Sequence, residues 1–271
     1  NGAFQNASSL TSIEIPASVT SIELNAFASS GLTSVTFPQN SLLTSIGQNA
    51  FRSASGLTSI TIPASVTSIG NYAFDGASSL TSITFPQNSL LTSIGSNAFQ
   101  SSSLTSITIP AGVTSIGSNA FRSASSLTSI TFSPDSLLTS IGSNAFRSSG
   151  LTSIEIPEGV TSIGSNAFRS ASSLTSIEIP EGVTSIEYGA FLYALGLTSI
   201  TFPQNSLLTS IGDFAFDGAS SLTSINIPAS VTSIGRYAFQ NAFSLTSITF
   251  PQNSLLTSIG YSAFYNVSGL T

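Results

Sequence analysis

The chain has 271 residues and a formal net charge of −6, and although 41% of its residues are hydrophobic, only 6% are charged. This apolar content exceeds that of a disordered polar tract, so the chain can bury a core. The acidic balance disfavours nucleic acid as a partner, since phosphate binding requires a basic surface. The sequence has no Cys and no apolar run of about 18 residues, so we expect neither disulfides nor membrane insertion.

Near-identical repeats fill the chain. No single repeat can bury its apolar face, but stacked repeats form a continuous core, so this periodicity predicts a solenoid. We expect one solenoid domain over residues 1–271, with about eleven complete turns and truncated at both ends. Aligned on Leu-Thr-Ser-Ile or its Val variant, the turns are 22 to 25 residues apart and begin at Leu10, Leu32, Leu57, Leu80, Leu104, Leu127, Leu151, Leu174, Leu197, Leu222 and Leu245.

The first element of each turn is predicted to be a half-buried strand. In the turn 57–79, Ile60 and Ile62 alternate with Ser59 and Thr61, and this period of two is typical of a strand with one buried face. Pro63 ends the strand because proline lacks the N–H that a ladder requires.

A second, shorter strand follows in the same turn. Val66 to Ile69 repeats the apolar alternation more briefly, and Gly70 permits a sharp turn after it. Ala73 and Phe74 then place an aromatic ring under the next turn. We therefore expect a mainly β fold with two strands per turn and little helix.

Two kinds of turn alternate along the chain. Short turns carry Ile-Pro-Ala-Ser-Val or a close variant, and long turns carry Phe-Pro-Gln-Asn-Ser-Leu-Leu, as at 202–208. This alternation indicates duplication of a two-turn unit. It is interrupted only over 151–196, where two short turns are consecutive.

The pattern LTSIxIPxxVTSIGxxAFxxxxx resembles the BspA-type leucine-rich repeats over essentially the whole chain. The resemblance implies a right-handed, curved solenoid with a parallel sheet on the face that carries Ser and Thr. It also implies an extracellular or cell-surface protein that adheres to cells or matrix. Many repeats of this family carry Cys after Ala-Phe, where this chain has Ala77, Ala124, Ala171 and Ala219.

The chain lacks the side chains that most enzymes use. Without His or Cys, neither a Ser-His-Asp nor a Cys-His arrangement can form, and zinc sites of the usual type are excluded. Glycine occurs singly at turns rather than in a phosphate-binding loop. We therefore expect no enzymatic activity and no cofactor other than a possible calcium ion.

The outer face of the first strands carries the strongest candidate for binding. Strand alternation sends a file of Ser outward, beside a file of Thr that Glu replaces in some turns. Ser and Thr also suit an ordinary solvated sheet, and regular Thr files are typical of ice-binding proteins, so both alternatives stay open. The candidate residues are Ser59, Thr61, Ser82, Thr84, Ser106, Thr108, Ser129, Thr131, Ser153, Glu155, Ser176, Glu178, Ser199 and Thr201.

Four glutamates in the two consecutive short turns form a candidate calcium site. Glu155 and Glu178 share one outward position, and Glu158 and Glu181 lie just past each strand. Stacked like charges are unfavourable, and a divalent cation would relieve them. The alternative is that these glutamates are exposed turn residues screened by water.

Two further clusters interrupt the polar surface. Arg52, Arg122, Arg147 and Arg169 follow Ala-Phe on the face away from the Ser/Thr strands, where they keep the chain soluble or dock an acidic partner. Tyr188, Leu192, Tyr193 and Leu195 replace polar turn residues and form either a contact patch or local packing.

The leading functional hypothesis is an adhesion module that binds a protein or glycan on a cell surface or matrix. Two alternatives remain: a structural spacer or filament that assembles head to tail, and an ice-binding protein.

Overall fold

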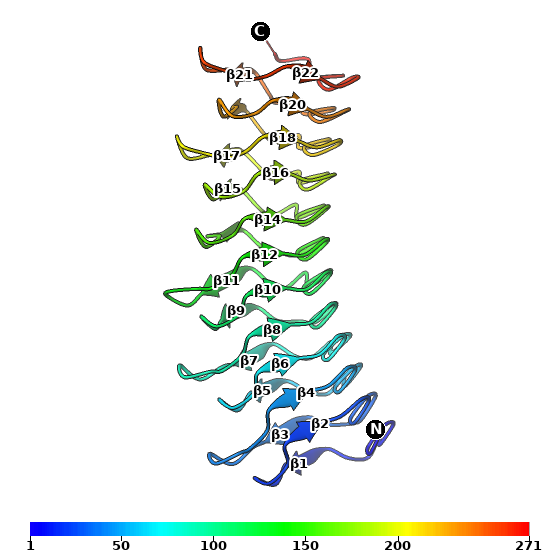
Figure 1. The fold of residues 1–271 in the computed structure, drawn as a ribbon. Helices are drawn as coiled ribbons and strands as arrows, with labels where there is room; N and C mark the ends of the chain where they lie inside the picture. The colour runs from blue at the N-terminus through cyan, green and yellow to red at the C-terminus, as the bar shows by residue number, and fades with distance from the viewer. Residues whose placement is uncertain (271) are drawn as a thin grey trace. The chain divides into compact units, whose positions relative to one another are not determined.

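The computed structural model describes residues 1–270, which divide between two compact units, Asn1–Leu138 and Thr139–Thr271. Each unit is a parallel β solenoid, and residues 1–270 contain 22 short strands, two per turn (Figure 1). The predicted mainly β solenoid is confirmed, and no helix occurs among residues 1–270. Consequently, no helix in this range could cross a lipid bilayer. The single domain expected over 1–271 stays a prediction.

In the first unit, the strands alternate between a first and a second position in each turn. The first strands are β1 (Ser12–Glu14), β3 (Ser34–Thr36), β5 (Ser59–Thr61), β7 (Ser82–Thr84), β9 (Ser106–Ile109) and β11 (Ser129–Phe132). The second strands are β2 (Ser21–Ile22), β4 (Ser45–Ile46), β6 (Ser68–Ile69), β8 (Ser93–Ile94) and β10 (Ser115–Ile116), and they form one parallel ladder.

The second unit repeats this pattern. Its first strands are β13 (Ser153–Ile154), β15 (Ser176–Glu178), β17 (Ser199–Thr201), β19 (Ser224–Asn226) and β21 (Ser247–Thr249). Its second strands are β12 (Ser140–Ile141), β14 (Ser162–Ile163), β16 (Ser185–Ile186), β18 (Ser210–Ile211), β20 (Ser233–Ile234) and β22 (Ser258–Ile259). Pairing is in register throughout, Ser opposite Ser and Ile opposite Ile, as between β18 and β20.

The two-turn duplication in the sequence is visible in the pairing of the first strands. β1 pairs with β3, β5 with β7 and β9 with β11, so each pair joins a short turn to the long turn that follows it. β3 contacts β5 and β7 contacts β9, but neither contact continues a ladder. The sheet on this face is therefore divided at the boundary between successive two-turn units.

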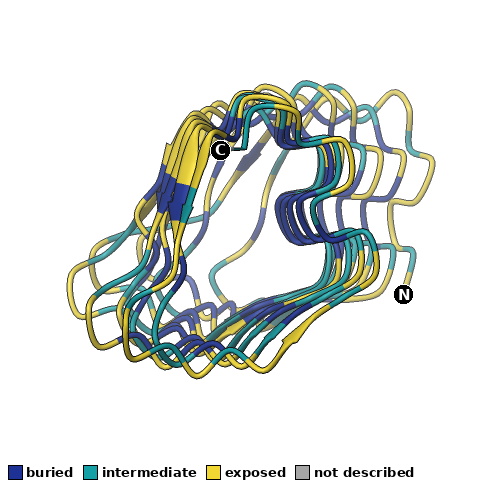
Figure 2. Ribbon diagram, turned by 90° about the horizontal axis from the view of Figure 1, so that it is seen from above, coloured by how far each residue is buried: buried dark blue, intermediate teal, exposed yellow. Residues whose placement is uncertain are grey.

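A column of phenylalanine rings runs through each unit. In the first unit, the rings from Phe4 to Phe121 stack in consecutive turns with centroids 5.1–5.4 Å apart and planes within 13°. In the second unit, the same arrangement runs from Phe146 to Phe264. Most of these rings are fully buried, and Figure 2 shows the buried segments along the inside of the turns. The predicted aromatic packing between turns is confirmed.

The glycine that follows most of the second strands acts through close approach rather than through a special backbone angle. A Cβ at Gly70 would lie 2.7 Å from the backbone of Gly47 and Gln48, closer than real side chains come. The positive φ falls instead on Tyr72, at 58°. The expectation that Gly70 permits a sharp turn is thus corrected: glycine here lets successive turns touch.

The one turn of the second unit that replaces this glycine shows the consequence. Gly212 donates its N–H to the Ile186 carbonyl at 2.7 Å, as the equivalent glycines of other turns do. Glu187 occupies the same position and makes no such bond among the described residues. The ladder of second strands ends at β14 and a new one begins at β16. The break coincides with the turn where a side chain replaces the glycine, as expected from the backbone clash that a Cβ would make at Gly212 or Gly235.

Replacing Gly117 with alanine is expected to destabilise the first unit. The added Cβ would lie 2.5 Å from the Gly95 carbonyl carbon and 2.6 Å from the Ser96 nitrogen, and overpacking against backbone costs about 2–3 kcal/mol. Chemical denaturation measures the change. Gly182→Ala is the matched control, because its Cβ would meet only a Thr161 methyl group at 3.2 Å before any backbone. Equal stability of the two variants would contradict the close-approach argument.

Candidate functional site

The structure places the predicted Ser/Thr residues of the first unit on one exposed face. We call this the Ser/Thr face: the outward residues of β5, β7, β9 and β11, namely Ser59, Thr61, Ser82, Thr84, Ser106, Thr108, Ser129 and Thr131. The register sets Ser59 beside Ser82 and Thr108 beside Thr131. All eight are exposed, because the pleat turns the intervening isoleucines into the core.

In the second unit, the remaining candidates occupy the equivalent outward positions. Ser153, Ser176 and Ser199 are in register on β13, β15 and β17, and Glu178 lies beside Thr201. Glu155 directly follows β13 and is exposed. The structure therefore brings each unit's candidates together on its first strands.

Two other sets of equivalent threonines look similar in sequence but have a structural role: one precedes the second strands and the other precedes the first strands. Thr67 donates both its backbone N–H (2.8 Å) and its hydroxyl (3.1 Å) to the Thr44 carbonyl of the preceding turn. Thr81 does the same to the Thr58 carbonyl, at 2.9 and 3.2 Å. By contrast, the hydroxyls of the Ser/Thr face make no hydrogen bond to any residue in 1–270. They are the ones that a ligand can engage.

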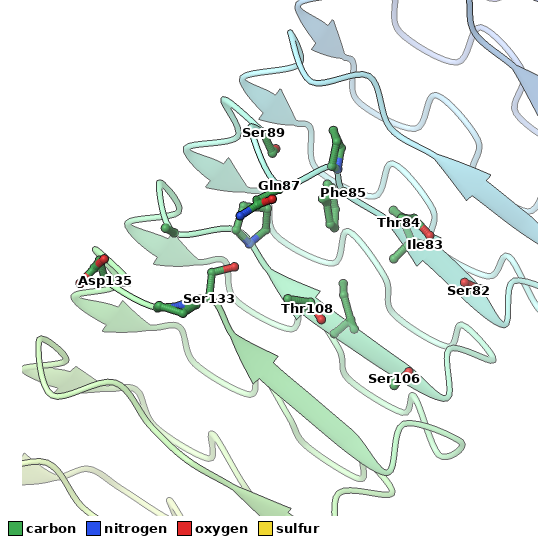
Figure 3. A pocket seen from close by; sticks show the side chains of 15 residues that line it. Ser82, Ile83, Thr84, Phe85, Gln87, Ser89, Ser106, Thr108, Ser133 and Asp135 are labelled. Atoms are coloured by element: carbon green, nitrogen blue, oxygen red, sulfur yellow. The ribbon is translucent and has the colours of Figure 1, made fainter. Parts of the chain in front are cut away.

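Within the first unit, a hollow of about 730 Å³ lies beside β7 and β9 of the Ser/Thr face, toward the loops that follow the first strands. Its walls include Thr84, Phe85 and Gln87 from β7 and the loop after it, Thr108 from β9, and Ser133 and Asp135 from the loop after β11. Figure 3 shows these side chains around the opening. The hollow is open to solvent and mainly polar, with Phe85 half-buried in its wall.

The position of the hollow follows from the two-turn unit. Each long loop is fastened to the short turn before it: the Leu90 N–H donates to the Ala64 carbonyl (2.9 Å), and the Leu137 N–H donates to the Ala111 carbonyl (2.8 Å). The long loop after β7 thus belongs to the preceding short turn, whereas β7 and β9 share no ladder. The gap opens at this boundary.

Sequence reasoning missed Asp135 as a candidate. It lies in Phe-Ser-Pro-Asp-Ser, where the other long turns have Phe-Pro-Gln-Asn-Ser. Its φ of 57° gives the loop a different backbone from the equivalent Asn88, which has no positive φ. The departure from the repeat was the available signal, but only the structure places Asp135 among the residues that line the hollow.

The four glutamates of the proposed calcium site do not form a compact cluster. Glu155, Glu158 and Glu178 are exposed and Glu181 is half-buried. Within the described part of the chain, no three or more acidic side chains gather as metal ligands would. The calcium hypothesis therefore stays a prediction, resting on Glu155 and Glu178 alone.

The aromatic patch is larger in the structure than in the sequence. Tyr188 packs against Phe214 at 5.6 Å, Phe214 stacks on Tyr237 at 4.9 Å, and Tyr237 meets Tyr261 edge-on at 5.6 Å. Tyr188, Tyr193 and Leu195 are exposed, whereas Leu192 is buried. Leu192 is therefore a packing residue, and Tyr188 begins a row of rings that continues through Phe214, Tyr237 and Tyr261 in the second unit.

Two aspartates, Asp75 and Asp217, occupy the position after Ala-Phe that holds an arginine in other turns. Asp75 accepts a hydrogen bond from Arg52 Nε at 3.1 Å, and Asp217 accepts one from Asn241 Nδ2 at 3.1 Å. Burial raises the pKa of both carboxyls above the ordinary value, and these partners offset the effect only partly. Arg52 is thus paired within the chain, and Arg169 is half-buried with an Nε that finds no acceptor.

The sequence matches the protein family described as BspA type leucine-rich repeat region, in six copies over residues 1–110, 92–208 and 209–271. None of the curated proteins matches it. It is similar to the structure of a leucine-rich cell surface protein from Faecalibacterium prausnitzii A2-165, with 31% identity over 93% of this chain and 79% of that chain and a TM-score of 0.47. It is also similar to the pneumococcal vaccine antigen PcpA, with 23% identity, 95% and 79% coverage and a TM-score of 0.49.

Replacing Thr67 with valine is expected to lower stability by about 0.5–1 kcal/mol, because the hydroxyl bond to the Thr44 carbonyl is lost while shape is kept. Thr61→Val on the Ser/Thr face is the control, since its hydroxyl bonds to no described residue, and its stability should match that of the parent. Thermal or urea unfolding measures both. A destabilised Thr61→Val variant with an unaffected Thr67→Val variant would reverse the assignment of structural and available hydroxyls.

Replacing Asp217 with asparagine is expected to stabilise the protein at neutral pH. Because burial raises its pKa above 3.8, the folded chain holds this proton more tightly than the unfolded chain. The contribution of Asp217 to stability is therefore fully present below 3.8 and is lost as pH rises through the raised value. Asparagine keeps an acceptor for Asn241 and carries no charge.

The measurement is the melting temperature from acidic to neutral pH, which should vary less in the Asp217→Asn variant. Asp75→Asn is the comparison: its carboxylate pairs with Arg52, so neutralising it should give a smaller gain. A lower melting temperature for Asp217→Asn at neutral pH would show that the ionised carboxylate stabilises the fold.

Proposed function

Because this chain belongs to the BspA-type leucine-rich repeat family, we propose that it is a non-enzymatic cell-surface module that adheres by binding a protein or glycan on its Ser/Thr face. The similar protein from Faecalibacterium prausnitzii is described as a cell surface protein, and PcpA as a vaccine antigen. These descriptions support an extracellular or cell-surface location for this chain.

One observation carries the proposal: the hydroxyls of the Ser/Thr face are available, while those of the neighbouring threonine files are bonded to carbonyls. If Ser and Thr served only to cover a solvated sheet, the two kinds of file would be interchangeable. They are not, since Thr44, Thr67 and Thr92 bond across turns and Thr61 and Thr84 make no bond within the described chain. The face offers a regular array of donors and acceptors on a rigid scaffold.

The chemistry of the face also favours binding over catalysis. It presents hydroxyls without His or Cys to activate them. Few charged side chains lie on it, so recognition would depend on hydrogen bonds and shape rather than on long-range attraction. Such a surface suits a partner that is itself polar and weakly charged.

The test is binding of the immobilised chain to matrix proteins, glycans and whole cells, with and without calcium. We expect saturable binding that falls roughly tenfold or more when Ser59→Ala, Thr61→Val, Ser129→Ala and Thr131→Val are combined, because several hydrogen bonds are lost together. Ser125→Ala with Ser126→Ala is the control, because these exposed residues lie in the loop between Phe121 and Leu127, away from the strands. The proposal that the ligand binds on the Ser/Thr face would be refuted if the control variant lost binding or if the combined variant bound as tightly as the parent.

Calcium dependence would support the Glu155 and Glu178 hypothesis, and Glu178→Gln should then abolish it. Absence of any partner would instead favour the two remaining hypotheses. A spacer or filament predicts light scattering that grows with concentration, and an ice-binding protein predicts shaping of ice crystals.

A further inference from the structure

The hollow beside β7 and β9 has a lining that points to one chemical class of ligand. Thr84, Thr108 and Ser133 supply hydroxyls, and Gln87 supplies an amide, so most polar groups here both donate and accept hydrogen bonds. Only Asp135 is charged. A volume of about 730 Å³ is within the range of small-molecule sites.

Three other classes of ligand fit the lining poorly. An anionic ligand would find no Lys or Arg among these residues and would face the carboxylate of Asp135. A divalent cation would find one carboxylate where it needs several oxygen ligands. A peptide strand that extends a sheet needs a free strand edge with room beside it, whereas the free edges of β7 and β9 adjoin each other with Cα atoms within 8 Å, less than the width of an inserted strand.

The half-buried ring of Phe85 adds an apolar surface to this polar lining. Sugars combine hydroxyls, which donate and accept, with an apolar C–H face that packs on an aromatic ring. We propose that the hollow binds a neutral oligosaccharide, with Gln87 and Asp135 bonding its hydroxyls and Phe85 packing against its ring. This inference rests on the proposed function and specifies the ligand at one end of the same face.

Asp135 makes this hollow different from the others that the two-turn unit can form. The loops at 37–43 and 85–91 share the sequence Phe-Pro-Gln-Asn-Ser-Leu-Leu and carry no carboxylate, whereas the loop at 132–138 carries Asp135. A carboxylate accepts two sugar hydroxyls at once and does so more strongly than a neutral acceptor. Its positive φ of 57° sets the direction in which the loop presents it.

The experiment uses the full chain on an array of immobilised neutral glycans (glucans, mannans, galactans and xylans), with sialylated and sulfated glycans as acidic arms. Calorimetry with the soluble oligosaccharide that scores highest then gives the affinity. We expect binding to a neutral glycan that weakens roughly tenfold or more in the Gln87→Ala, Asp135→Gly double variant. Glycine keeps the backbone angle of residue 135 without strain.

Gln204→Ala is the matched control. It removes the same side chain from an identical long loop in the second unit, where no aspartate follows, and it should keep full affinity. Phe85→Leu, which keeps an apolar side chain at a half-buried position, should weaken binding without lowering the melting temperature appreciably.

Two outcomes would overturn the inference. One is that the chain binds cells or matrix proteins but no neutral glycan, which would leave the proposed function standing and remove this ligand class. The other is neutral glycan binding that the double variant does not change, which would place the sugar elsewhere. If the chain binds neither glycans, nor cells, nor matrix proteins, the proposed function itself fails.

Discussion

The close contact between successive turns is the constraint on which the rest of the structure depends. Each turn is too thin to bury its own apolar residues, so its isoleucines and its phenylalanine are covered only when the next turn lies directly against it. That distance is short enough that Gly117 has no room for a Cβ. Where Glu187 replaces the glycine, the ladder of second strands stops and a new one begins.

The same contact separates two uses of one side chain. A threonine beside a second strand, such as Thr67, reaches the carbonyl of the turn before it, so its hydroxyl helps to hold the stack together. A threonine that points out from a first strand of the first unit, such as Thr61, is exposed and makes no hydrogen bond through its hydroxyl to the described residues. The same hydroxyl group thus stabilises the stack at Thr67 and is available to bind a ligand at Thr61. A count of Ser and Thr in the sequence hides this difference.

The alternation of short and long turns adds a second level of order. In the first unit each long loop bonds back to the short turn before it, and the first strands pair within two-turn units and separate between them. The first strands of this unit therefore form separate pairs rather than one uniform sheet, whereas in the second unit β13, β15 and β17, which include the two consecutive short turns, form one three-stranded sheet. The hollow that contains Asp135 lies at a boundary between two pairs of the first unit, so its existence follows from the duplication of a two-turn unit and its charge follows from one local departure from the repeat.

The sequence by itself determined the solenoid, the two strands per turn, the burial of Ile60 and Phe74 and the outward position of the Ser/Thr files, because a period of two and a repeat of 22 to 25 residues allow few other arrangements. It also indicated the two-turn unit. Only the tertiary structure decided which threonine hydroxyls bond to a carbonyl, why Gly70 is glycine, where the paired strands separate and that Asp135 and Gln87 line the same hollow. Those properties depend on the spatial distance between residues some 23 to 50 positions apart in the sequence, such as Thr44 and Thr67 or Gln87 and Asp135. The pattern of residues along the chain does not give such distances.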